Sequence, residues 1–412
     1  MPEFLSLLPP DAARSLFFRS IGTPKPDVQL IKTLNALGRI TARDIYSPQP
    51  LPVFARSTVD GFAVKARDTF GANETLPGYL ALVGEVPMGT ASEQILSSGQ
   101  CLLIHTGGML PDGADAVVML EYSSPVRPGE IEIQRSVANG ENVIQIGEDV
   151  RENQVVIQQG VRIRPAEIGG LMALGIQKIR VIKKIRVGII SSGDEIISPE
   201  SQNQPGKVRD VNSYTLASLV SQAGGIPIIY GIVPDRFELL KDTVANSLKE
   251  CDVVVITAGS SASTRDMTAD VIDSLGKPGV LVHGINTRPG KPTILGICEG
   301  KAIIGLPGNP VSALINGYLF VVPLIEKILG ISERKILPVV KARLSLNLAS
   351  QAGREDWQPV KLTPVDSGWL AEPVFGKSNL IFTLVAADGM IKIHPDANGI
   401  SAGELVDVHL ME

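Results

Sequence analysis

The sequence predicts a multidomain protein of α/β plus β class, in which one α/β domain with a parallel sheet is joined to β-rich domains. Between Arg186 and about Gly330, short and nearly all-apolar strands alternate with helical segments. Before and after this region, short strand patterns are broken by Gly, Pro and Asn. At 412 residues the chain is also too long for one hydrophobic core, so we expect roughly two to four domains.

The first domain is predicted to be discontinuous and elongated, formed by residues 1–50 and 148–185. Apolar residues recur at helical spacing from Val28 to Leu37, and Gly38 is placed to end a helix. We therefore expect an amphipathic helix over 28–37. Its partner surface is expected in the second part, where Pro165 opens a short helix and a strand follows.

Residues 51–147 are predicted to form an inserted β domain. Turn residues separate four strand-like segments there, GYLALVGEV, QCLLIHTGG, DAVVMLEY and GEIEIQRSV. The C-terminal residues 334–412 show the same character in VKARLSL, DWQPVKL, MIKIHP and LVDVHLM, which predicts a small β-barrel or sandwich.

Residues 186–333 are predicted to form the α/β domain. Its expected strands are IRVGII, IPIIYGIV, DVVVITAG, GVLVHGI and KAIIGLP, with helices over 214–223, 236–248 and 268–275. Apolar strands separated by helices indicate a parallel sheet buried on both faces. Ligands bind such a sheet at the carboxyl ends of its strands, so residues just after each strand are the first candidates for chemistry.

The charge balance argues against nucleic acid as a partner. The chain has 38 Lys and Arg against 43 Asp and Glu, a net charge of −5, without a basic block or stripe. The N-terminus MPEFLSLLPP shows no secretory signal pattern. The apolar stretch 311–329 is interrupted by Asn316, Pro323 and Glu326, so we expect a buried helix there and no membrane partner.

Cysteine and histidine usage points away from disulfide, metal-thiolate and nucleophilic chemistry. Cys101, Cys251 and Cys298 are few and widely separated, which indicates a reduced, cytoplasmic protein. The four histidines are scattered and no Ser or Cys lies in an elbow motif, so the histidines are expected to be structural.

An anion site is expected around GLPGNPVSA, from Gly305 to Ala313, which leaves an apolar strand and opens a helix. Pro307 stiffens the turn, Gly308 allows close approach of a ligand, and the helix N-terminus directs N–H groups outward. Taken alone, an ordinary strand-to-helix turn is the alternative interpretation. Just upstream, RPGKP adds the cations Arg288 and Lys291.

Carboxylates follow the strands of the α/β domain, at Asp194, Glu195, Asp210, Asp235 and Asp266. Asp235 with Glu238 is equally consistent with a helix capping pair, and Asp210 can cap the helix that begins near Ser213. Asp194 and Glu195 have no local cap to make. Carboxylates at one sheet edge repel unless a cation such as Mg²⁺ lies among them, which suggests a phosphate-bearing ligand beside a second anion.

Six motifs together identify a family. They are STVDGFAV from Ser57, HTGGMLPDGADAVVMLE from His105, GENVIQIGEDV from Gly140, VGIISSGDEI from Val187, RPGKPTILG from Arg288 and GLPGNPVSA. Alone, the Asp60-Gly61 pair in the first of these predicts a hairpin turn. In this order and over essentially the whole chain, the motifs resemble the molybdopterin molybdenumtransferase (MoeA) family, which includes the E domain of gephyrin.

The resemblance implies the four-domain architecture above, with a molybdopterin-binding-like α/β domain and a C-terminal β-barrel. It also implies a two-fold homodimer whose active site lies between the α/β domain of one subunit and the inserted domain of the other. The implied enzyme is a metal-dependent transferase that inserts molybdate into the dithiolene of adenylated molybdopterin and releases AMP. Mg²⁺ or another divalent cation is its implied cofactor, and the adenylating protein of the same pathway is a possible partner.

Site residues follow from the motif positions. The resemblance implies that the acidic metal and substrate residues are Glu195, Asp235 and Asp266, helped by Asp60, Thr106 and Asp149. For molybdate and cofactor binding it implies Arg288, Lys291, Gly305, Pro307, Gly308, Ser312, Arg354 and Ser378. In GSSASTRD, from Gly259 to Asp266, this chain is one residue shorter than the usual family loop. The alternatives are a non-catalytic molybdopterin- or cofactor-binding paralogue for storage, regulation or scaffolding, and a hydrolase of another nucleotidyl ester.

Overall fold

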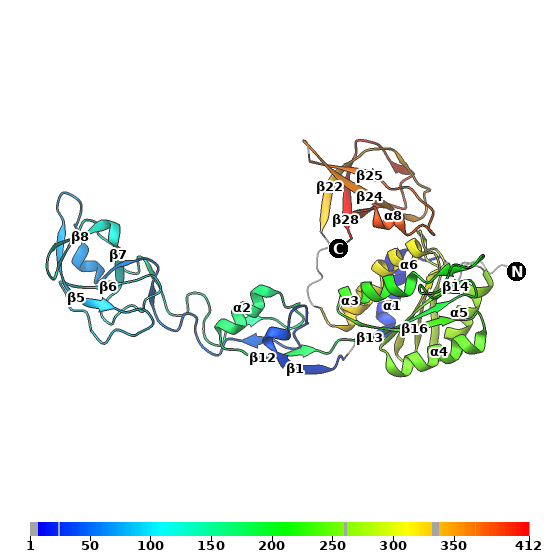
Figure 1. Ribbon diagram of the computed structural model, residues 1–412, viewed down its shortest axis with the longest axis horizontal. Helices are drawn as coiled ribbons and strands as arrows, with labels where there is room; N and C mark the ends of the chain where they lie inside the picture. The colour runs from blue at the N-terminus through cyan, green and yellow to red at the C-terminus, as the bar shows by residue number, and fades with distance from the viewer. Residues whose placement is uncertain (1–6, 24, 259–261, 332–337, 367, 412) are drawn as a thin grey trace. The chain divides into compact units, whose positions relative to one another are not determined.

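The computed structural model describes residues 7–23, 25–258, 262–331, 338–366 and 368–411, with the side chains of 262–266 outside the description. Two compact units are present (Figure 1). We call Met1–Ala42, Gly160–Arg164 and Ile179–Glu412 the sheet-and-barrel unit, and Arg43–Gln159 with Pro165–Lys178 the inserted unit. The finer division into four domains remains a prediction.

A six-stranded sheet forms the centre of the α/β region, in the order β16-β13-β17-β21-β20-β18. The strands are β13 Arg186–Ser192, β16 Ile226–Val233, β17 Val253–Ala258, β18 Pro278–His283, β20 Ile294–Cys298 and β21 Lys301–Pro307. The helices that follow or precede them are α3 Asn212–Ala223, α4 Phe237–Glu250 and α5 Ala262–Ser274. The predicted strands and helices of this region are thereby confirmed.

The sequence had suggested a parallel sheet, but the observed sheet is mixed. β16, β13, β17 and β21 are parallel, but β20 runs antiparallel to both β21 and β18. A hairpin turn at Glu299 and Gly300, with φ of 50° and 78°, joins β20 to β21. Two positive φ angles are what a tight hairpin requires, so this turn accounts for the reversal.

The apolar stretch after β21 is helical and largely buried. It runs through α6 Pro310–Asn316, a π-helical segment Gly317–Val321 and α7 Val322–Ile328. Within the described residues, Pro310–Ile328 is the one helix long and apolar enough to cross a membrane; its most apolar 18-residue stretch has a mean hydropathy of 1.5, and 61% of that stretch is buried inside the protein. Phe320 and Leu324 lie in the core, which confirms the expected buried helix.

An N-terminal helix that the sequence did not indicate packs on this domain. α1 spans Pro10–Ile21, and its Ala13 and Phe17 are completely buried. Both belong to the hydrophobic cluster that also contains Val282 and Leu295, from β18 and β20. The start of the chain therefore completes the core of the α/β sheet.

The amphipathic helix expected over 28–37 is wrong. Val28–Lys32 is a strand, β1, paired with β12 Lys178–Ile182, and Thr33–Asn35 is one 3₁₀ turn. Exposure alternates along β1, with Val28 51% and Leu30 59% exposed. Apolar residues at i and i+3 fit a helix only if a core covers that face, whereas β12 supplies hydrogen bonds to an extended chain. The predicted helix after Pro165 is confirmed as α2 Pro165–Ala173.

The inserted unit is β-rich, as expected. Its six-stranded sheet has the order β7-β4-β6-β5-β9-β8. The strands are β4 Gly61–Val64, β5 Gly78–Val86, β6 Gln100–Ile104, β7 Ala116–Met119, β8 Ser123–Arg127 and β9 Glu130–Ile133. Two small ladders complete it, pairing β3 Arg56–Ser57 with β10 Val143–Ile144 and β2 Ile45–Tyr46 with β11 Val155–Ile157.

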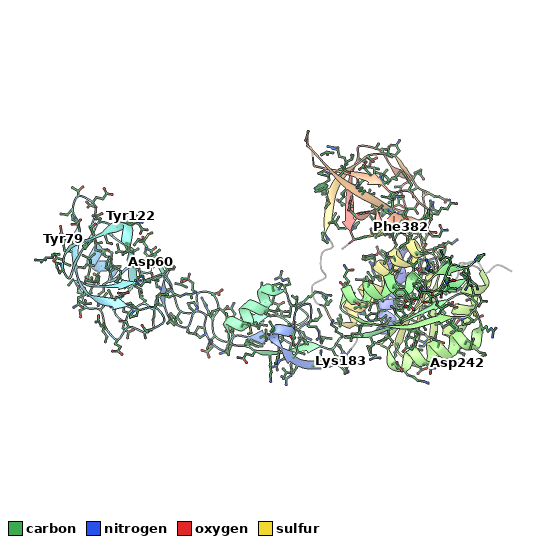
Figure 2. The ribbon with its side chains drawn as sticks, viewed as in Figure 1. Asp60, Tyr79, Tyr122, Lys183, Asp242 and Phe382 are labelled. Carbon is green, nitrogen blue, oxygen red and sulfur yellow. The ribbon has the colours of Figure 1, made fainter. Side chains whose placement is uncertain are left out.

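The C-terminal strands close into a barrel, which decides between barrel and sandwich. β24 Glu355–Val365, β25 Gly368–Pro373, β22 Val339–Leu344, β28 Leu405–Leu410 and β26 Gly389–Ile393 are hydrogen-bonded in that order, and β26 pairs back onto β24. The short helix α8 Phe382–Val385 carries the exposed Phe382 (Figure 2). A further strand, β19 Thr287–Arg288, joins the barrel beside β24.

Candidate active site

Two aspartates, Asp194 and Asp235, are hydrogen-bonded where the neighbouring strands β13 and β16 end. Ser192, the buried last residue of β13, donates its hydroxyl to Asp235 Oδ1 at 2.8 Å. The Asp235 backbone N–H in turn faces Asp194 Oδ1 at 3.3 Å. Because parallel strands present their carboxyl ends at one edge, residues 43 apart in sequence are brought into contact.

Glu195 follows on a sharp turn. Gly193 has φ of 157°, and its N–H donates to the carbonyl of Val233 at 3.2 Å. A Cβ at Gly193 would lie 2.8 Å from Glu195 Oε2, so the glutamate folds back over the turn. Its carboxylate remains exposed, next in sequence to the Asp194–Asp235 pair.

The capping alternatives are resolved differently for the two aspartates. Asp210 is 6% exposed and accepts the backbone N–H of Ser213 at 3.1 Å, so it caps α3 as the alternative proposed. For α4 the N-cap is Arg236, without a side-chain cap bond, so the capping pair of Asp235 and Glu238 is wrong. The carboxylate of Asp235 instead accepts the hydrogen bond from the Ser192 hydroxyl at the sheet edge.

Asp266, the third predicted metal residue, has a side chain outside the described residues. Within the part of the chain whose side chains are described, no group of three or more His, Cys, Asp or Glu is arranged to hold a metal. The donor set nevertheless fits Mg²⁺, because this ion keeps several waters and is commonly held by one or two carboxylates together with substrate phosphates. Asp235 and Glu195 provide such oxygens.

A cavity of about 1100 Å³ lies between the β19 loop, the start of α6 and the barrel. Four cations line it, Arg288, Lys291, Arg354 and Lys377. Of the eight residues predicted for molybdate and cofactor binding, six line this cavity, namely Arg288, Lys291, Pro307, Ser312, Arg354 and Ser378. Gly305 is instead enclosed in β21, and the carbonyl of Gly308 accepts from Asn212 Nδ2 at 2.8 Å.

The helix N-terminus is less open to an anion than the sequence suggested. The Val311 N–H, in the first turn of α6, already donates to the carbonyl of Ser378 at 3.0 Å. Asn309 Nδ2 also donates to Ser378 Oγ at 3.0 Å. The barrel loop therefore occupies part of this end of the helix, and the positive charge of the cavity comes mainly from its side chains.

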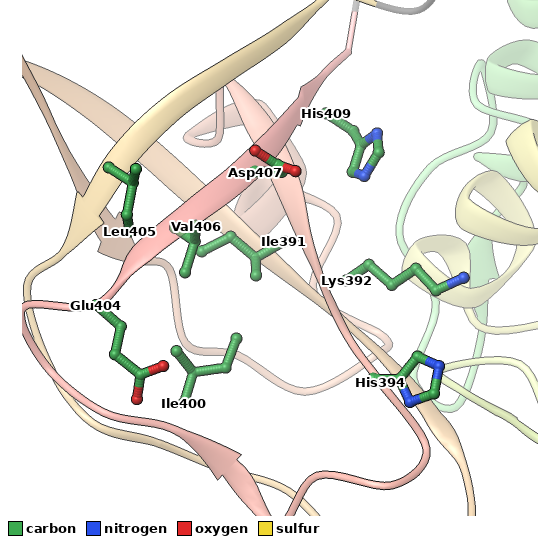
Figure 3. A pocket seen from close by; sticks show the side chains of 9 residues that line it. All are labelled: Ile391, Lys392, His394, Ile400, Glu404, Leu405, Val406, Asp407 and His409. Atoms are coloured by element: carbon green, nitrogen blue, oxygen red, sulfur yellow. The ribbon is translucent and has the colours of Figure 1, made fainter.

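A second cavity, of about 340 Å³, lies in the barrel (Figure 3). It is lined by Lys392, His394, Glu404, Asp407, His409 and apolar neighbours, and contains none of the predicted site residues. Burial lowers the pKa of His409, which packs edge-on against Trp357 with ring centroids 5.5 Å apart. This contact agrees with a structural role for that histidine.

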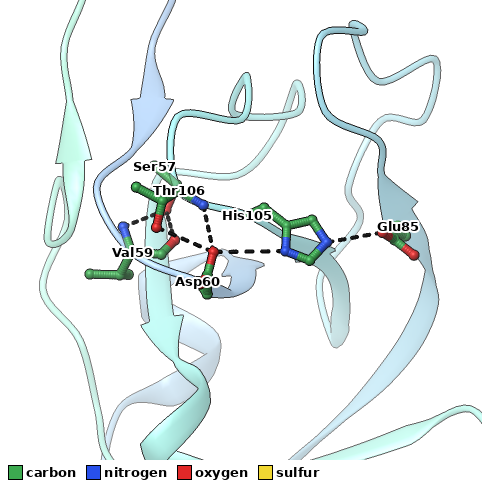
Figure 4. Close-up of polar contacts among 6 residues, drawn as sticks. All are labelled: Ser57, Val59, Asp60, Glu85, His105 and Thr106. Atoms are coloured by element: carbon green, nitrogen blue, oxygen red, sulfur yellow. Dashed lines mark hydrogen bonds and ion pairs between the residues drawn. The ribbon is translucent and has the colours of Figure 1, made fainter.

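In the inserted unit, Asp60 is the centre of a polar cluster (Figure 4). Its Oδ1 accepts the backbone N–H of Thr106 at 2.7 Å and the Thr106 hydroxyl at 3.2 Å. His105 lies between Asp60 and Glu85, with nitrogen-to-oxygen distances of 3.7 and 3.0 Å. The backbone bond from Thr106 is the main reason that the pKa of Asp60 lies below its ordinary value. Two of the residues that the resemblance implies for the site, Asp60 and Thr106, are therefore in direct contact.

The hairpin alternative for Asp60-Gly61 is wrong. Gly61 starts β4 and pairs with both Ile104 and Met119, inside the sheet. A Cβ at Gly61 would lie 2.0 Å from the carbonyl oxygen of Val118, so the close approach of strands requires a glycine there. Asp149 is exposed in the same unit, and among the described residues no hydrogen bond or ion pair joins it to Asp60.

Sequence reasoning missed two charged residues of the cavity, Lys377 and Asp356. Lys377 immediately precedes the predicted Ser378. Asp356 is the first residue of the predicted strand DWQPVKL and lies two residues after Arg354, which precedes β24. No sequence pattern indicated that its carboxylate would bind the Arg354 side chain.

The fold and the cavity define a class: a multidomain protein whose α/β region and barrel share a cation-lined cavity. Comparisons then name the family. Residues 8–175 match "MoeA N-terminal region (domain I and II)", 188–327 match "Probable molybdopterin binding domain", and 341–411 match "MoeA C-terminal region (domain IV)". The chain belongs to the MoeA family.

Similar proteins share the full length. A putative molybdopterin biosynthesis protein of Methanocaldococcus jannaschii is 37% identical, covering 99% of both chains. The molybdopterin molybdenumtransferase of Haemophilus influenzae is 31% identical, covering 97% of both. The crystal structure of a molybdopterin biosynthesis MoeA protein from Pyrococcus horikoshii has a TM-score of 0.86 and 32% identity, covering 98% of this chain and 100% of that one.

Proposed function

We propose that this protein is a molybdopterin molybdenumtransferase that inserts molybdate into the dithiolene of adenylated molybdopterin and releases AMP. The observation that carries the proposal is the cavity in which Arg288, Lys291, Ser312, Arg354 and Ser378 converge. Cationic and hydroxyl side chains around a cavity are suited to a tetrahedral oxyanion, because charge-assisted hydrogen bonds to it are strong. Molybdate is therefore the substrate assigned to this cavity.

The carboxylate edge has the complementary task. Asp235, oriented by the Ser192 hydroxyl, and the exposed Glu195 would hold a divalent cation such as Mg²⁺. When bound, that ion would neutralise charge on the pyrophosphate of the adenylated substrate. The residues of the edge orient the adenylate end, while the cation-lined cavity holds the incoming oxyanion near the dithiolene.

We propose a two-fold homodimer in which Asp60 and Thr106 of one subunit complete the site of the other. Support comes from their position: both lie in the inserted unit, whereas Asp235 and Glu195 lie in the sheet-and-barrel unit. Exposed apolar side chains, at 51% for Val28, 74% for Leu34 and 61% for Leu37, are available for an interface. The three buried free cysteines support the expected cytoplasmic setting.

The deciding experiment is a coupled assay with adenylated molybdopterin and Mg²⁺, with and without molybdate, following AMP release and active cofactor. We expect both products only when molybdate is present. AMP release at the same rate with and without molybdate would indicate a hydrolase of the nucleotidyl ester. Tight binding of molybdopterin without turnover would indicate a storage or scaffold protein.

A further inference from the structure

The cation-lined cavity contains a carboxylate in an unexpected place. Asp356 is the one acidic residue among the described residues that line it, facing four cations. Its side chain is only 9% exposed. A bare carboxylate would repel an incoming oxyanion, so the use made of its two oxygens decides whether Asp356 hinders or assists binding.

Both oxygens of Asp356 are occupied by donors. Arg354 Nε donates to Oδ1 at 2.8 Å, and Arg354 Nη2 reaches Oδ2 at 3.4 Å. The hydroxyl of Ser350 donates to Oδ2 at 2.9 Å. Arg288 Nη1 lies 3.9 Å from the same oxygen. One buried carboxylate thus contacts two of the arginines that the oxyanion would meet.

The backbone brings these arginines together across two parts of the chain. Arg288 in β19 is in parallel register with Asp356 in β24. The N–H of Glu355 donates to the carbonyl of Asn286 at 3.1 Å, and the Thr287 hydroxyl donates to the carbonyl of Glu355 at 3.1 Å. These bonds fix the main chain, but the long arginine side chains need a separate partner to hold their end groups.

The two arginine side chains differ in how far they are exposed to solvent. The side chain of Arg354 is 28% exposed, and that of Arg288 is 64% exposed. A guanidinium has five N–H donors in a fixed planar arrangement. When Arg354 uses Nε and one Nη2 hydrogen for Asp356, no hydrogen bond joins its other donors to the described residues, and their direction is fixed.

We propose that Asp356 is a positioning residue of the anion cavity, which fixes the guanidinium of Arg354 and draws Arg288 toward it, so that both direct their remaining donors at one tetrahedral oxyanion. The inference rests on the proposed function for the identity of that oxyanion as molybdate. Asp356 acts through the arginines and does not itself contact the anion.

The opposite role makes the opposite prediction. If Asp356 only reduced the positive charge of the cavity, its neutralisation would strengthen oxyanion binding. If it positions the arginines, neutralisation frees Arg354 and weakens binding. The sign of the change in affinity therefore separates the two roles.

The experiment measures the affinity of molybdate alone by calorimetry, on the full chain, for wild type, Asp356→Asn, Arg354→Ala and the double variant. Asp356→Asn should weaken binding by about ten- to a hundredfold, as expected for loss of a charge-assisted bond. The double variant should bind no more weakly than Arg354→Ala, because residues that act through one another are not additive. The molybdate KM of the complete reaction should rise in Asp356→Asn, with kcat restored at saturating molybdate.

Two further variants make the test decisive. Asp407→Asn is the matched control, since Asp407 pairs with Lys341 at 3.0 Å elsewhere on the barrel, and it should leave affinity within about twofold. Arg354→Lys keeps the positive charge but loses the planar guanidinium with its two parallel N–H donors, so it should also weaken molybdate binding. This variant tests the inference independently if Asp356→Asn folds poorly.

Four results would overturn the inference: tighter binding by Asp356→Asn, unchanged binding by Asp356→Asn, additive losses in the double variant, or wild-type affinity in Arg354→Lys. Wild-type protein that binds no molybdate would overturn the proposed cavity function as well. If the wild type binds molybdate and Asp356→Asn binds it with the same affinity, only the proposed role of Asp356 is overturned.

Discussion

At the scale of single residues, the partner of a carboxylate decides what it can do. Asp210 is used by a backbone N–H and caps a helix. Asp235 is held by a serine hydroxyl at 2.8 Å, and Asp60 by a threonine in a loop. In the sequence, Asp210 and Asp235 looked alike as acidic residues after strands, whereas Asp60 lay in a motif that alone predicts a hairpin turn. Their partners lie up to 46 residues away in sequence, so local pattern could not separate capping from a site role.

Glu195→Gln should lower activity by at least roughly tenfold while the fold is kept. The change removes one charge from the carboxylate edge and preserves the side-chain shape, so a divalent cation is held less well. The measurement is steady-state cofactor formation at several Mg²⁺ concentrations, with circular dichroism as the check of folding. Glu200→Gln, on the exposed residue of the same segment, is the matched control. Unchanged turnover in Glu195→Gln would assign that residue a structural role.

Lys291→Ala should raise the molybdate requirement by roughly ten- to a hundredfold, because it removes a charge-assisted bond to the oxyanion. Binding of the adenylate end should be nearly unaffected, so high molybdate should restore most of the rate. The measurement is cofactor formation against molybdate at saturating adenylated molybdopterin.

Lys361→Ala, an exposed barrel lysine that does not line the cavity, is the control for loss of a surface charge. It should change the molybdate requirement by less than about twofold. An equally small shift in Lys291→Ala, or a loss that no molybdate concentration repairs, would place the anion elsewhere.

At the scale of elements, apolar strands bounded by turn residues could be predicted, but elements whose partners lie far along the chain could not. KAIIGLP coincides with β21, which is buried along nearly its whole length as a strand covered on both faces should be. IPIIYGIV coincides with β16, although this strand lies at the sheet edge, with Ile226 41% and Ile229 43% exposed. β1 was mistaken for a helix since its partner β12 lies about 150 residues later. α1 was missed because its buried face, with Ala13 and Phe17, is complementary to strands much further along the chain.

Gly61→Ala should destabilise the inserted unit by about 1–3 kcal/mol or more, because the new Cβ would meet the backbone of β7. The new Cβ would lie only 2.0 Å from the carbonyl oxygen of Val118, and this backbone atom cannot move aside as the end of a flexible side chain can. The measurement is the shift in urea unfolding.

Gly169→Ala is the matched comparison in the same unit. Gly169 lies in α2, is exposed, and has open space where a Cβ would go. Alanine there should stabilise by about 0.5–1 kcal/mol, since it restricts the unfolded chain and favours the helix. Equal effects of the two changes would show that the strand contact at Gly61 is not close.

At the scale of the whole molecule, the family resemblance correctly predicted six of the residues that line the cavity. Six of the eight anion and cofactor residues line one cavity because the sheet, the β19 loop and the barrel place them there. Two features could not be predicted from the sequence. One is the hydrogen bond from the Val311 N–H, in the first turn of α6, to the carbonyl of Ser378 in the barrel loop. The other is the contact of Asp356 with both Arg288 and Arg354. Both depend on contacts between distant strands.

The protein should sediment as a dimer with twice the 43.8 kDa mass of the chain. The shared site needs a second copy, and an apolar surface at Leu34 and Leu37 is exposed in the single chain. The measurement is sedimentation velocity at micromolar concentration, for wild type and for Leu34→Glu with Leu37→Glu, which should dissociate.

Lys183→Glu is the control for an equal surface charge change without loss of apolar area, on a lysine whose side chain is 61% exposed. It should remain dimeric. A monomeric wild type would count decisively against a site shared between subunits.

The docking of α1 on the sheet has a consequence for how the chain is made. Ala13 and Phe17 pack against a core that includes Val282 and Leu295, roughly 270 residues later in the chain. At about 5–20 residues per second on the ribosome, the apolar face of α1 waits roughly 15–55 seconds for its partners. α1 is therefore synthesised long before the strands that bury it, so its apolar face is a natural client for chaperones that shield exposed apolar segments during translation.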